Sequence, residues 1–173
     1  MHRLEGLIDI FLQPGEFFVA DADYQIRTML GSCVSITLWH PFKRMGAMSH
    51  FLLPTRGAHE PTGELDGRYG DEAMQLMLAQ LKQFGIAPSQ CQGKIFGGGN
   101  MFPDHVRPGA SSVGQRNGEA ALELLAMHGV PVISESLFGV GHRQIIFDVS
   151  TGDVWCQQIP PGLPGQEPEG DMV

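Results

Sequence analysis

The sequence predicts a single α/β domain, a layered sandwich in which a mixed or antiparallel β-sheet packs against at least two helices. Two observations predict this class. Several short segments have the alternation or apolar character of strands, and two longer segments carry apolar residues at three- and four-residue spacing. The chain has 173 residues, of which 42% are hydrophobic, so it is long enough to bury a core of its own. These patterns do not determine the order of the strands.

The strands are predicted from alternation and from the turns that bound them. Apolar residues at 34, 36 and 38 alternate with Ser35 and Thr37, and a second apolar run covers 45–53. The segment 40–43 between them contains a proline that suits a turn, so the two runs predict a β-hairpin. Further strands are predicted at 17–20, 24–30, 92–96, 131–133, 145–149 and 154–155.

Two helices are predicted from apolar spacing. The segment 71–84 has apolar residues on one face and Gly85 after its end, and 113–128 has a similar face that is also closed by a glycine. Residues 1–158 are therefore assigned to one domain. The remaining residues, 159–173, are rich in proline, glycine and acid, and we expect an extended or disordered tail there.

The composition argues against several classes of function. The net charge of −8 disfavours non-specific nucleic-acid binding, which needs a basic face. No apolar run is long enough to span a bilayer, and the short run 7–12, interrupted by Asp9, does not predict a signal peptide. The three cysteines lack the spacing of a disulfide framework or a zinc ribbon, which fits a reducing cytoplasm. The cysteines are Cys33, Cys91 and Cys156.

Cys33 and His50 are the candidate catalytic pair of the predicted hairpin. If the turn is centred between residues 41 and 42, paired positions sum to 83, and Cys33 lies directly opposite His50. Directly opposed residues have Cβ atoms about 4.5–5.5 Å apart, which lets a thiol and an imidazole share a proton. Gly31 permits a sharp turn before them, so the backbone N–H groups of Ser32 and Cys33 are candidate oxyanion donors. The alternative is a buried core cysteine and a hydrogen-bonded core histidine.

Gly97, Gly98 and Gly99 follow a predicted strand, as in some phosphate-binding loops. The segment lacks the Gly-Lys-Ser/Thr ending of a P-loop and the spacing of a dinucleotide fingerprint. Close backbone packing near the candidate site is the favoured interpretation.

Several motifs carry a resemblance to a known family. They are Leu30-Gly31-Ser32-Cys33-Val34, Gly46-Ala47-Met48-Ser49-His50-Phe51-Leu52-Leu53-Pro54, Lys94-Ile95-Phe96-Gly97-Gly98-Gly99-Asn100-Met101 and Gly114-Gln115-Arg116-Asn117. Together they resemble the CheD family, the chemoreceptor glutamine deamidases of bacterial chemotaxis, over residues 12–157. The chain departs from the family pattern at 136–139 and 141–144, where we expect a different loop shape.

The resemblance implies roles for particular residues. Cys33 would be the nucleophile, His50 the base, and Thr28 the third member that orients the imidazole. The same motifs give four candidate residues for substrate binding, which are Gly98, Asn100, Arg116 and Asn117. A structural salt bridge is an equally good explanation for Arg116.

The resemblance also implies an activity. The protein would be a cytoplasmic protein-glutamine glutaminase that converts glutamines on the cytoplasmic helices of chemoreceptors to glutamates. Glutamyl methyl esters are close acyl donors, so a methylesterase side activity is expected. No metal or organic cofactor is required by this chemistry.

Three alternatives stay open. The first is a CheD-like adaptor that binds receptors or the CheC phosphatase with little or no catalysis. The second, a papain-like peptidase, is disfavoured because its cysteine normally opens a long helix and its histidine lies far downstream. The third is a zinc site formed by Cys33, His50 and His59.

Overall fold

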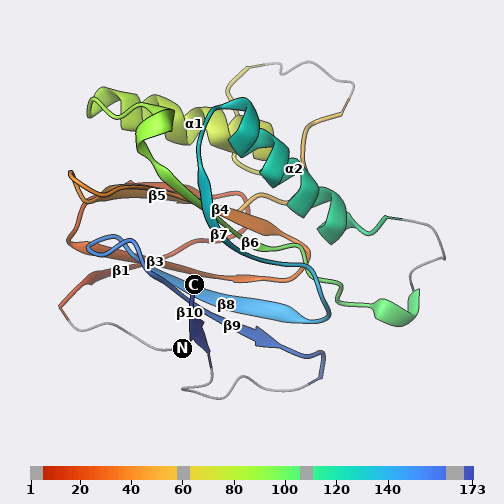
Figure 1. Ribbon diagram of the computed structural model, residues 1–173. Coiled ribbons are helices and arrows are strands. Elements are labelled where there is room, and N and C mark those ends of the chain that lie inside the picture. The colour runs from red at the N-terminus through yellow and green to blue at the C-terminus, as the bar shows by residue number, and fades with distance from the viewer. Residues whose placement is uncertain (1–5, 58–62, 106–110, 163–169) are drawn as a thin grey trace.

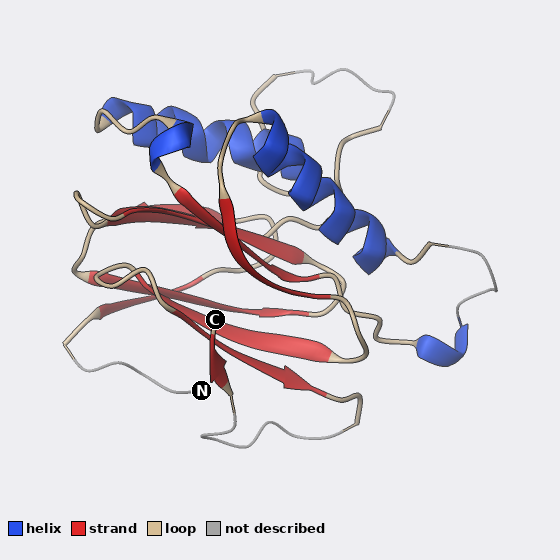
Figure 2. Ribbon diagram, viewed as in Figure 1, coloured by secondary structure: helices blue, strands red, loops and turns tan. Residues whose placement is uncertain are grey.

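The protein is built in three layers, two facing β-sheets and a layer of helices (Figures 1 and 2). The computed structural model describes residues 6–57, 63–105, 111–162 and 170–173, and in these residues ten strands form two five-stranded sheets. Two α-helices cover the outer face of one sheet. The predicted α/β layered class with two packed helices is confirmed, and the structure adds that the β-layer is double.

The sheet that the helices cover has the strand order β2-β5-β4-β6-β7. Its neighbours are antiparallel except for β6 and β7, which are parallel. The bounds are β2 Phe17–Ala20, β4 Val34–His40, β5 Met45–Ser49, β6 Gln92–Gly97 and β7 Val132–Leu137.

The second sheet has the order β1-β3-β8-β9-β10, with β1 and β3 parallel and the other neighbours antiparallel. The bounds are β1 Ile8–Phe11, β3 Tyr24–Leu30, β8 His142–Asp148, β9 Val154–Ile159 and β10 Asp171–Met172.

The helices are α1 Gly70–Gln83 and α2 Val113–Met127, close to the predicted 71–84 and 113–128. The Ser112 hydroxyl caps α2 by accepting a hydrogen bond from the Gln115 N–H at 3.1 Å. Short 3₁₀ turns lie at Pro88–Gln90 and Pro103–His105.

Two cores follow from the alternation of side chains in the strands. Val34, Ile36 and Leu38 of β4 are fully buried on the face that meets the helices. The opposite face meets the second sheet, where Ile26 and Leu30 of β3 pack in the same apolar cluster as residues of β5, β6, β8 and β9. Alternate residues of a strand share a face, and Thr28 stands in this alternation between Ile26 and Leu30. Its side chain therefore also points into the layer between the sheets.

The register of the β4–β5 hairpin differs from the prediction. His40 pairs with Met45, and an isolated bridge joins Val34 to Phe51, so paired positions sum to 85 rather than 83. The reason is the turn: β4 continues to His40, and the turn residues 41–44 end with Arg44 at φ 49°. The turn is thus centred one residue later than predicted, and every cross-strand partner shifts by two residues.

The end of the chain forms a strand. Asp171 and Met172 pair antiparallel with Cys156 and Trp155, and the Lys94 Nζ donates a hydrogen bond to the Val173 carbonyl oxygen at 2.7 Å. An extended or disordered tail is predicted at 159–173, and residues 171–172 are extended and pair with the edge strand β9. Residues 163–169 of the predicted tail lie outside the described part.

Candidate functional site

Of the three predicted catalytic residues, Thr28 and His50 are in contact between the two sheets, and Cys33 packs against the apolar core of the same layer. Cys33 directly precedes β4 and His50 directly follows β5, whereas Thr28 lies in β3 of the opposite sheet. Thr28 and His50 are almost completely buried, at 0% and 2% exposure, and Cys33 is partly exposed. The site is therefore an interior pair of polar side chains with the thiol at its outer end.

Cys33 and His50 are diagonal neighbours in the hairpin. In the observed register the positions opposite Cys33 and His50 are Leu52 and Ser35, so the predicted direct opposition of the pair is wrong. The shift of two residues keeps both side chains on one face, as diagonal neighbours. Among the described residues no hydrogen bond links the Cys33 thiol to the imidazole, and such contacts in enzymes without substrate often tighten only on binding.

Thr28 fixes the tautomer of His50. The Thr28 hydroxyl donates to the Leu12 carbonyl oxygen at 2.8 Å, and its oxygen lies 2.8 Å from His50 Nδ1. The hydroxyl has one proton, and a carbonyl cannot donate, so the second contact requires that Nδ1–H donates to Thr28. The proton of the neutral ring is therefore on Nδ1, and Nε2 keeps the lone pair of a base.

The backbone of His50 is held by a β-bulge at the start of β2. The His50 N–H donates to the Glu16 carbonyl at 3.1 Å, and its carbonyl accepts from the Gly15 N–H at 2.8 Å. Gly15 and Glu16 thus both lie opposite the single residue His50, which defines the bulge. Gly15 has φ 87°, a value that only glycine adopts easily. Gly15 and Glu16 therefore anchor the backbone of the candidate base.

Burial sets the protonation state of the pair. It lowers the pKa of His50 to about 4, with the Glu16 carboxylate opposing this shift, and it raises the pKa of the Cys33 thiol. At neutral pH the resting site therefore holds a neutral thiol and a neutral imidazole. A neutral imidazole with a free Nε2 can accept a proton, which is what a general base requires.

The loop before β4 has its carbonyl oxygens turned inward. The Gly31 carbonyl accepts from the Gly99 N–H at 2.9 Å, and the Cys33 carbonyl accepts from the Gly98 N–H at 3.0 Å. In the described part of the chain the N–H groups of Ser32 and Cys33 donate to no protein group. These two predicted oxyanion donors are therefore available to a bound group.

The four predicted substrate-binding residues differ in their surroundings. Gly98 is buried and its N–H donates to the Cys33 carbonyl, and Asn100 Oδ1 accepts from the Phe102 N–H at 3.0 Å. Asn117 is fully buried, whereas Arg116 is exposed and its guanidinium makes no hydrogen bond or ion pair with the described residues. The Arg116 N–H donates to the Ser112 carbonyl at 3.1 Å in the first turn of α2. Arg116 is thus the member of this set whose charged group is available to a substrate.

Sequence reasoning missed two contacts of the site. Asn117 Nδ2 donates to the Ser32 carbonyl at 3.0 Å and to the Leu52 carbonyl at 2.8 Å, which ties α2 to both catalytic segments. The Leu12 carbonyl and the Glu16 charge also act on the Thr28–His50 pair, although both residues lie far from His50 in the sequence. The Arg-Asn motif was the available signal for the first contact, and no local pattern signals the second.

The segment that departs from the family pattern contains a buried cation. Arg143 is 2% exposed and donates to the Ser136 hydroxyl at 3.1 Å, the Gly97 carbonyl at 3.2 Å and the Phe138 carbonyl at 2.7 Å. Its guanidinium therefore binds the glycine segment to the loop after β7 without a carboxylate partner among the described residues.

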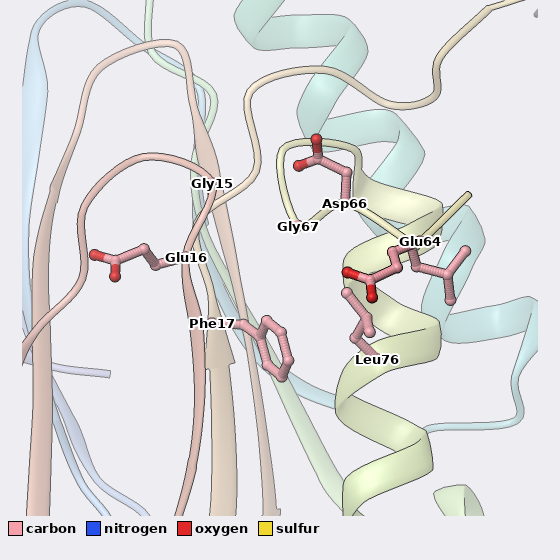
Figure 3. A pocket seen from close by; sticks show the side chains of 8 residues that line it. Gly15, Glu16, Phe17, Glu64, Asp66, Gly67 and Leu76 are labelled. Atoms are coloured by element: carbon pink, nitrogen blue, oxygen red, sulfur yellow. The ribbon is translucent and has the colours of Figure 1, made fainter. Parts of the chain in front are cut away.

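A cavity of about 510 Å³ lies beside the bulge that holds His50, between the start of β2 and α1 (Figure 3). Phe17 and Leu76 point into it from opposite sides, whereas the Glu16 side chain points to the other side of its strand. The cavity is lined by Gly15, Glu16, Phe17, Glu64, Leu65, Asp66, Gly67 and Leu76. None of the predicted catalytic side chains lines it.

Within the described ranges, no group of three or more His, Cys, Asp or Glu side chains is placed to hold a metal ion. His59, the third member of the predicted zinc site, lies outside these ranges. None of the described helices combines the length and the apolar character needed to cross a membrane.

Comparison with known proteins gives a consistent result. Residues 52–158 match the family model described as CheD chemotactic sensory transduction. A protein of Albidiferax ferrireducens named "Probable chemoreceptor glutamine deamidase CheD 2" is 69% identical over 173 residues, the full length of both chains. A "Probable chemoreceptor glutamine deamidase CheD" of Pseudomonas savastanoi pv. phaseolicola is 44% identical over 162 residues, covering 92% of this chain and 90% of the relative. The family model begins after His50, so its match does not bear on the catalytic pair.

Proposed function

Because the chain belongs to the CheD family of chemotactic sensory transduction proteins, we propose that it hydrolyses glutamine side chains of chemoreceptors to glutamate by a Cys33–His50 mechanism. The names of its relatives supply the substrate class. The catalytic part is supported by the Thr28–His50 hydrogen bond, because it leaves the base nitrogen free on the face that Cys33 shares.

The first half of the reaction forms a thioester. His50 Nε2 takes the proton of the Cys33 thiol, and the thiolate attacks the carboxamide carbon of the glutamine. The carbonyl π electrons move to oxygen and form a tetrahedral oxyanion. When the C–O double bond re-forms, the C–N bond breaks, and the proton on His50 passes to the nitrogen so that ammonia leaves.

The second half regenerates the enzyme. Neutral His50 removes a proton from water, and the hydroxide attacks the thioester carbon. The C–S bond breaks, the proton on His50 passes to the sulfur to restore the Cys33 thiol, and the carboxylic acid gives its proton to solvent or to ammonia and leaves as glutamate. The sum is hydrolysis of one carboxamide by one water, with no change of redox state. A glutamyl methyl ester enters the same sequence with methanol as the leaving group, which is the basis of the expected methylesterase side activity.

The low pKa of His50 suits this sequence. A base that is neutral at pH 7 is ready for the first step, and the acid it becomes is strong enough to protonate a poor leaving group. Transfer of the proton creates a thiolate and an imidazolium next to each other. The two opposite charges attract each other, and this attraction offsets the cost of burying each of them. The ion pair forms during the reaction, when bound substrate excludes water from the site.

The N–H groups of Ser32 and Cys33 receive the oxyanion in this proposal. A donor of this kind contributes about 10²–10³ in rate in hydrolases that have been mutated. Arg116, exposed at the start of α2, is the proposed contact for a carboxylate or carbonyl of the receptor helix. Its replacement in Arg116→Ala should raise KM and leave kcat unchanged, because the guanidinium would bind substrate and transition state equally.

The deciding experiment uses a purified cytoplasmic receptor fragment and intact mass. Wild-type protein should add about one dalton per glutamine converted, whereas Cys33→Ala should add none because the nucleophile is absent. Cys91→Ala, at a cysteine buried against the helices, is the matched control and should retain activity.

The adaptor alternative gives a different result in the same samples. If the wild-type protein co-purifies with the receptor fragment and leaves its mass unchanged, catalysis is excluded and binding is the function. Addition of the CheC phosphatase to these samples tests the expected second partner.

A further inference from the structure

Asn117 joins the two catalytic segments through one nitrogen atom. Its Nδ2 donates both protons, one to the Ser32 carbonyl at 3.0 Å and one to the Leu52 carbonyl at 2.8 Å. Ser32 directly precedes the nucleophile Cys33, and Leu52 lies two residues after His50. The side chain is fully buried, so it acts on the site through these backbone groups and does not touch substrate.

The glycines around Asn117 allow α2 to come this close. A Cβ at Gly114 would lie 2.5 Å from the Gly99 carbonyl oxygen and 2.6 Å from that of Gly98, and a Cβ at Gly118 would overlap the Phe138 ring. Side chains at either position would therefore push the first turns of α2 away from the loops. The helix is placed so that the carboxamide of Asn117 reaches the nucleophile loop.

The hydrogen bond to Ser32 determines where the N–H of Cys33 points. The Ser32 carbonyl and the Cys33 N–H belong to one planar trans peptide, and in such a unit they point in opposite directions. Because Asn117 holds the carbonyl toward α2, the N–H is directed away from α2, and in the described residues it meets no protein acceptor. We propose that Asn117 is a positioning residue that orients the Cys33 N–H as an oxyanion donor, an inference that rests on the acyl-transfer chemistry proposed above.

The unsatisfied half of the carboxamide supports a functional role. Asn117 Oδ1 is buried and has no hydrogen-bond partner among the described residues. Such a group is unfavourable for stability, since buried polar atoms lose their hydration. A side chain selected for packing alone would be apolar and would not bury this oxygen. A carboxamide whose nitrogen donates two hydrogen bonds in the core buries its oxygen along with that nitrogen.

The test compares two reactions of the same thiol. Acylation of Cys33 by p-nitrophenyl acetate passes through a tetrahedral oxyanion, and alkylation by iodoacetamide does not. Asn117→Ser, which keeps one donor, and Asn117→Ala, which keeps none, should slow acylation by about 10-fold and about 10²-fold respectively. Alkylation rates, and their dependence on pH, should stay within about threefold of wild type because the Cys33–His50 pair is unchanged. Cys33→Ala supplies the background from the other two cysteines.

A control on the same helix separates positioning from stability. Ala121→Gly loosens a fully buried position one turn along α2, where the side chain packs in the apolar cluster between the helices and the sheet and carries no polar group. It should lower the melting temperature while the ratio of acylation to alkylation stays at the wild-type value. The Asn117 variants should change this ratio whatever their melting temperature.

Two results would overturn the inference: an unchanged ratio in both Asn117 variants, or acylation and alkylation that decline in parallel. Either would reduce Asn117 to a structural residue. The outcome is independent of the receptor assay, because an activated ester needs no receptor. A wild-type protein that is inert toward receptor glutamines but acylates in an Asn117-dependent way would refute the deamidase proposal and leave this inference intact.

Discussion

Replacement of Thr28 by valine tests the tautomer assignment on which the mechanism depends. Valine has nearly the shape of threonine, so the change removes the hydroxyl with little change in packed volume. Two buried groups lose their partner, the Leu12 carbonyl and the His50 Nδ1–H, each at 2.8 Å from the Thr28 oxygen. At about 1–3 kcal/mol for each unsatisfied buried group, the free energy of unfolding should fall by about 2–6 kcal/mol.

The larger effect should be on turnover. Without an acceptor at Nδ1, the ring no longer gains by carrying its proton there, and the tautomer with the proton on Nε2 cannot act as the base. If the productive tautomer loses about 2–3 kcal/mol of stabilisation, kcat/KM falls by about 10²-fold. Thr28→Ser keeps the hydroxyl and should retain most of the activity.

The assay is ammonia release from a receptor fragment, with ¹⁵N chemical shifts of the His50 ring measured on the same proteins. The wild-type protein should show a protonated Nδ1 and an unprotonated Nε2, and Thr28→Val should show a loss of this preference. A wild-type ring protonated at Nε2 would refute the reasoning, as would a Thr28→Val enzyme within about threefold of wild-type kcat/KM.

Three further predictions concern His50 and the glycine segment. The acidic limb of the kcat/KM profile should lie at about pH 4, because burial lowers the pKa of His50. Glu16→Gln should move this limb to lower pH, because it removes the carboxylate that raises the pKa of His50. A limb near pH 6.5 would contradict the burial argument. Since the pKa of His50 is lower in the folded than in the unfolded state, stability should fall as pH drops from about 6.5 toward 4, by about 3 kcal/mol in urea titrations, with a smaller fall in His50→Gln. Gly97→Ala should lower kcat at least about 10-fold, because the φ of 114° is strained for alanine and the added Cβ overlaps the Cys33 carbonyl. Gly129→Ala is the control: its φ of 71° is also strained for alanine, but its Cβ would lie in open space, so it should lower only the melting temperature.

The fold class and most elements could be predicted because they depend on local periodicity. Both α-helices and the strands β2 to β9 overlap the segments predicted from apolar patterns and turns, whereas β1 and β10 were not predicted. The division into two sheets could not be predicted, since alternation shows that a strand is half-buried but not which strand lies next to it. The parallel partners β1 and β3 show the difficulty: their pairing depends on contacts across the molecule.

The hairpin register failed for a different reason. A proline marks a turn but does not fix its position, and here the turn residues are 41–44, with Arg44 in a left-handed conformation, rather than the predicted 40–43. The hypothesis that Cys33 and His50 share a face survived because the error was an even number of residues. An error of one residue would have placed the two side chains on opposite faces.

The candidate site was predicted by motif more than by geometry. The resemblance selected Thr28, and the contact with His50 agrees with that choice. The connections of Asn117 to residues 32 and 52 could not be inferred from spacing, since they span 85 and 65 positions of the chain. A carboxamide on an amphipathic helix looks the same in sequence whether it faces solvent or two carbonyls.

The hydrogen bond between Thr28 and His50 crosses from one β-sheet to the other. The acid–base group and the group that sets its proton are thus carried by separate layers, joined here by apolar packing rather than by a strand ladder. A slide of one layer over the other by about an ångström would break a contact of 2.8 Å while every strand stayed paired. A partner that binds both sheets and displaces one relative to the other would therefore abolish turnover without unfolding the protein.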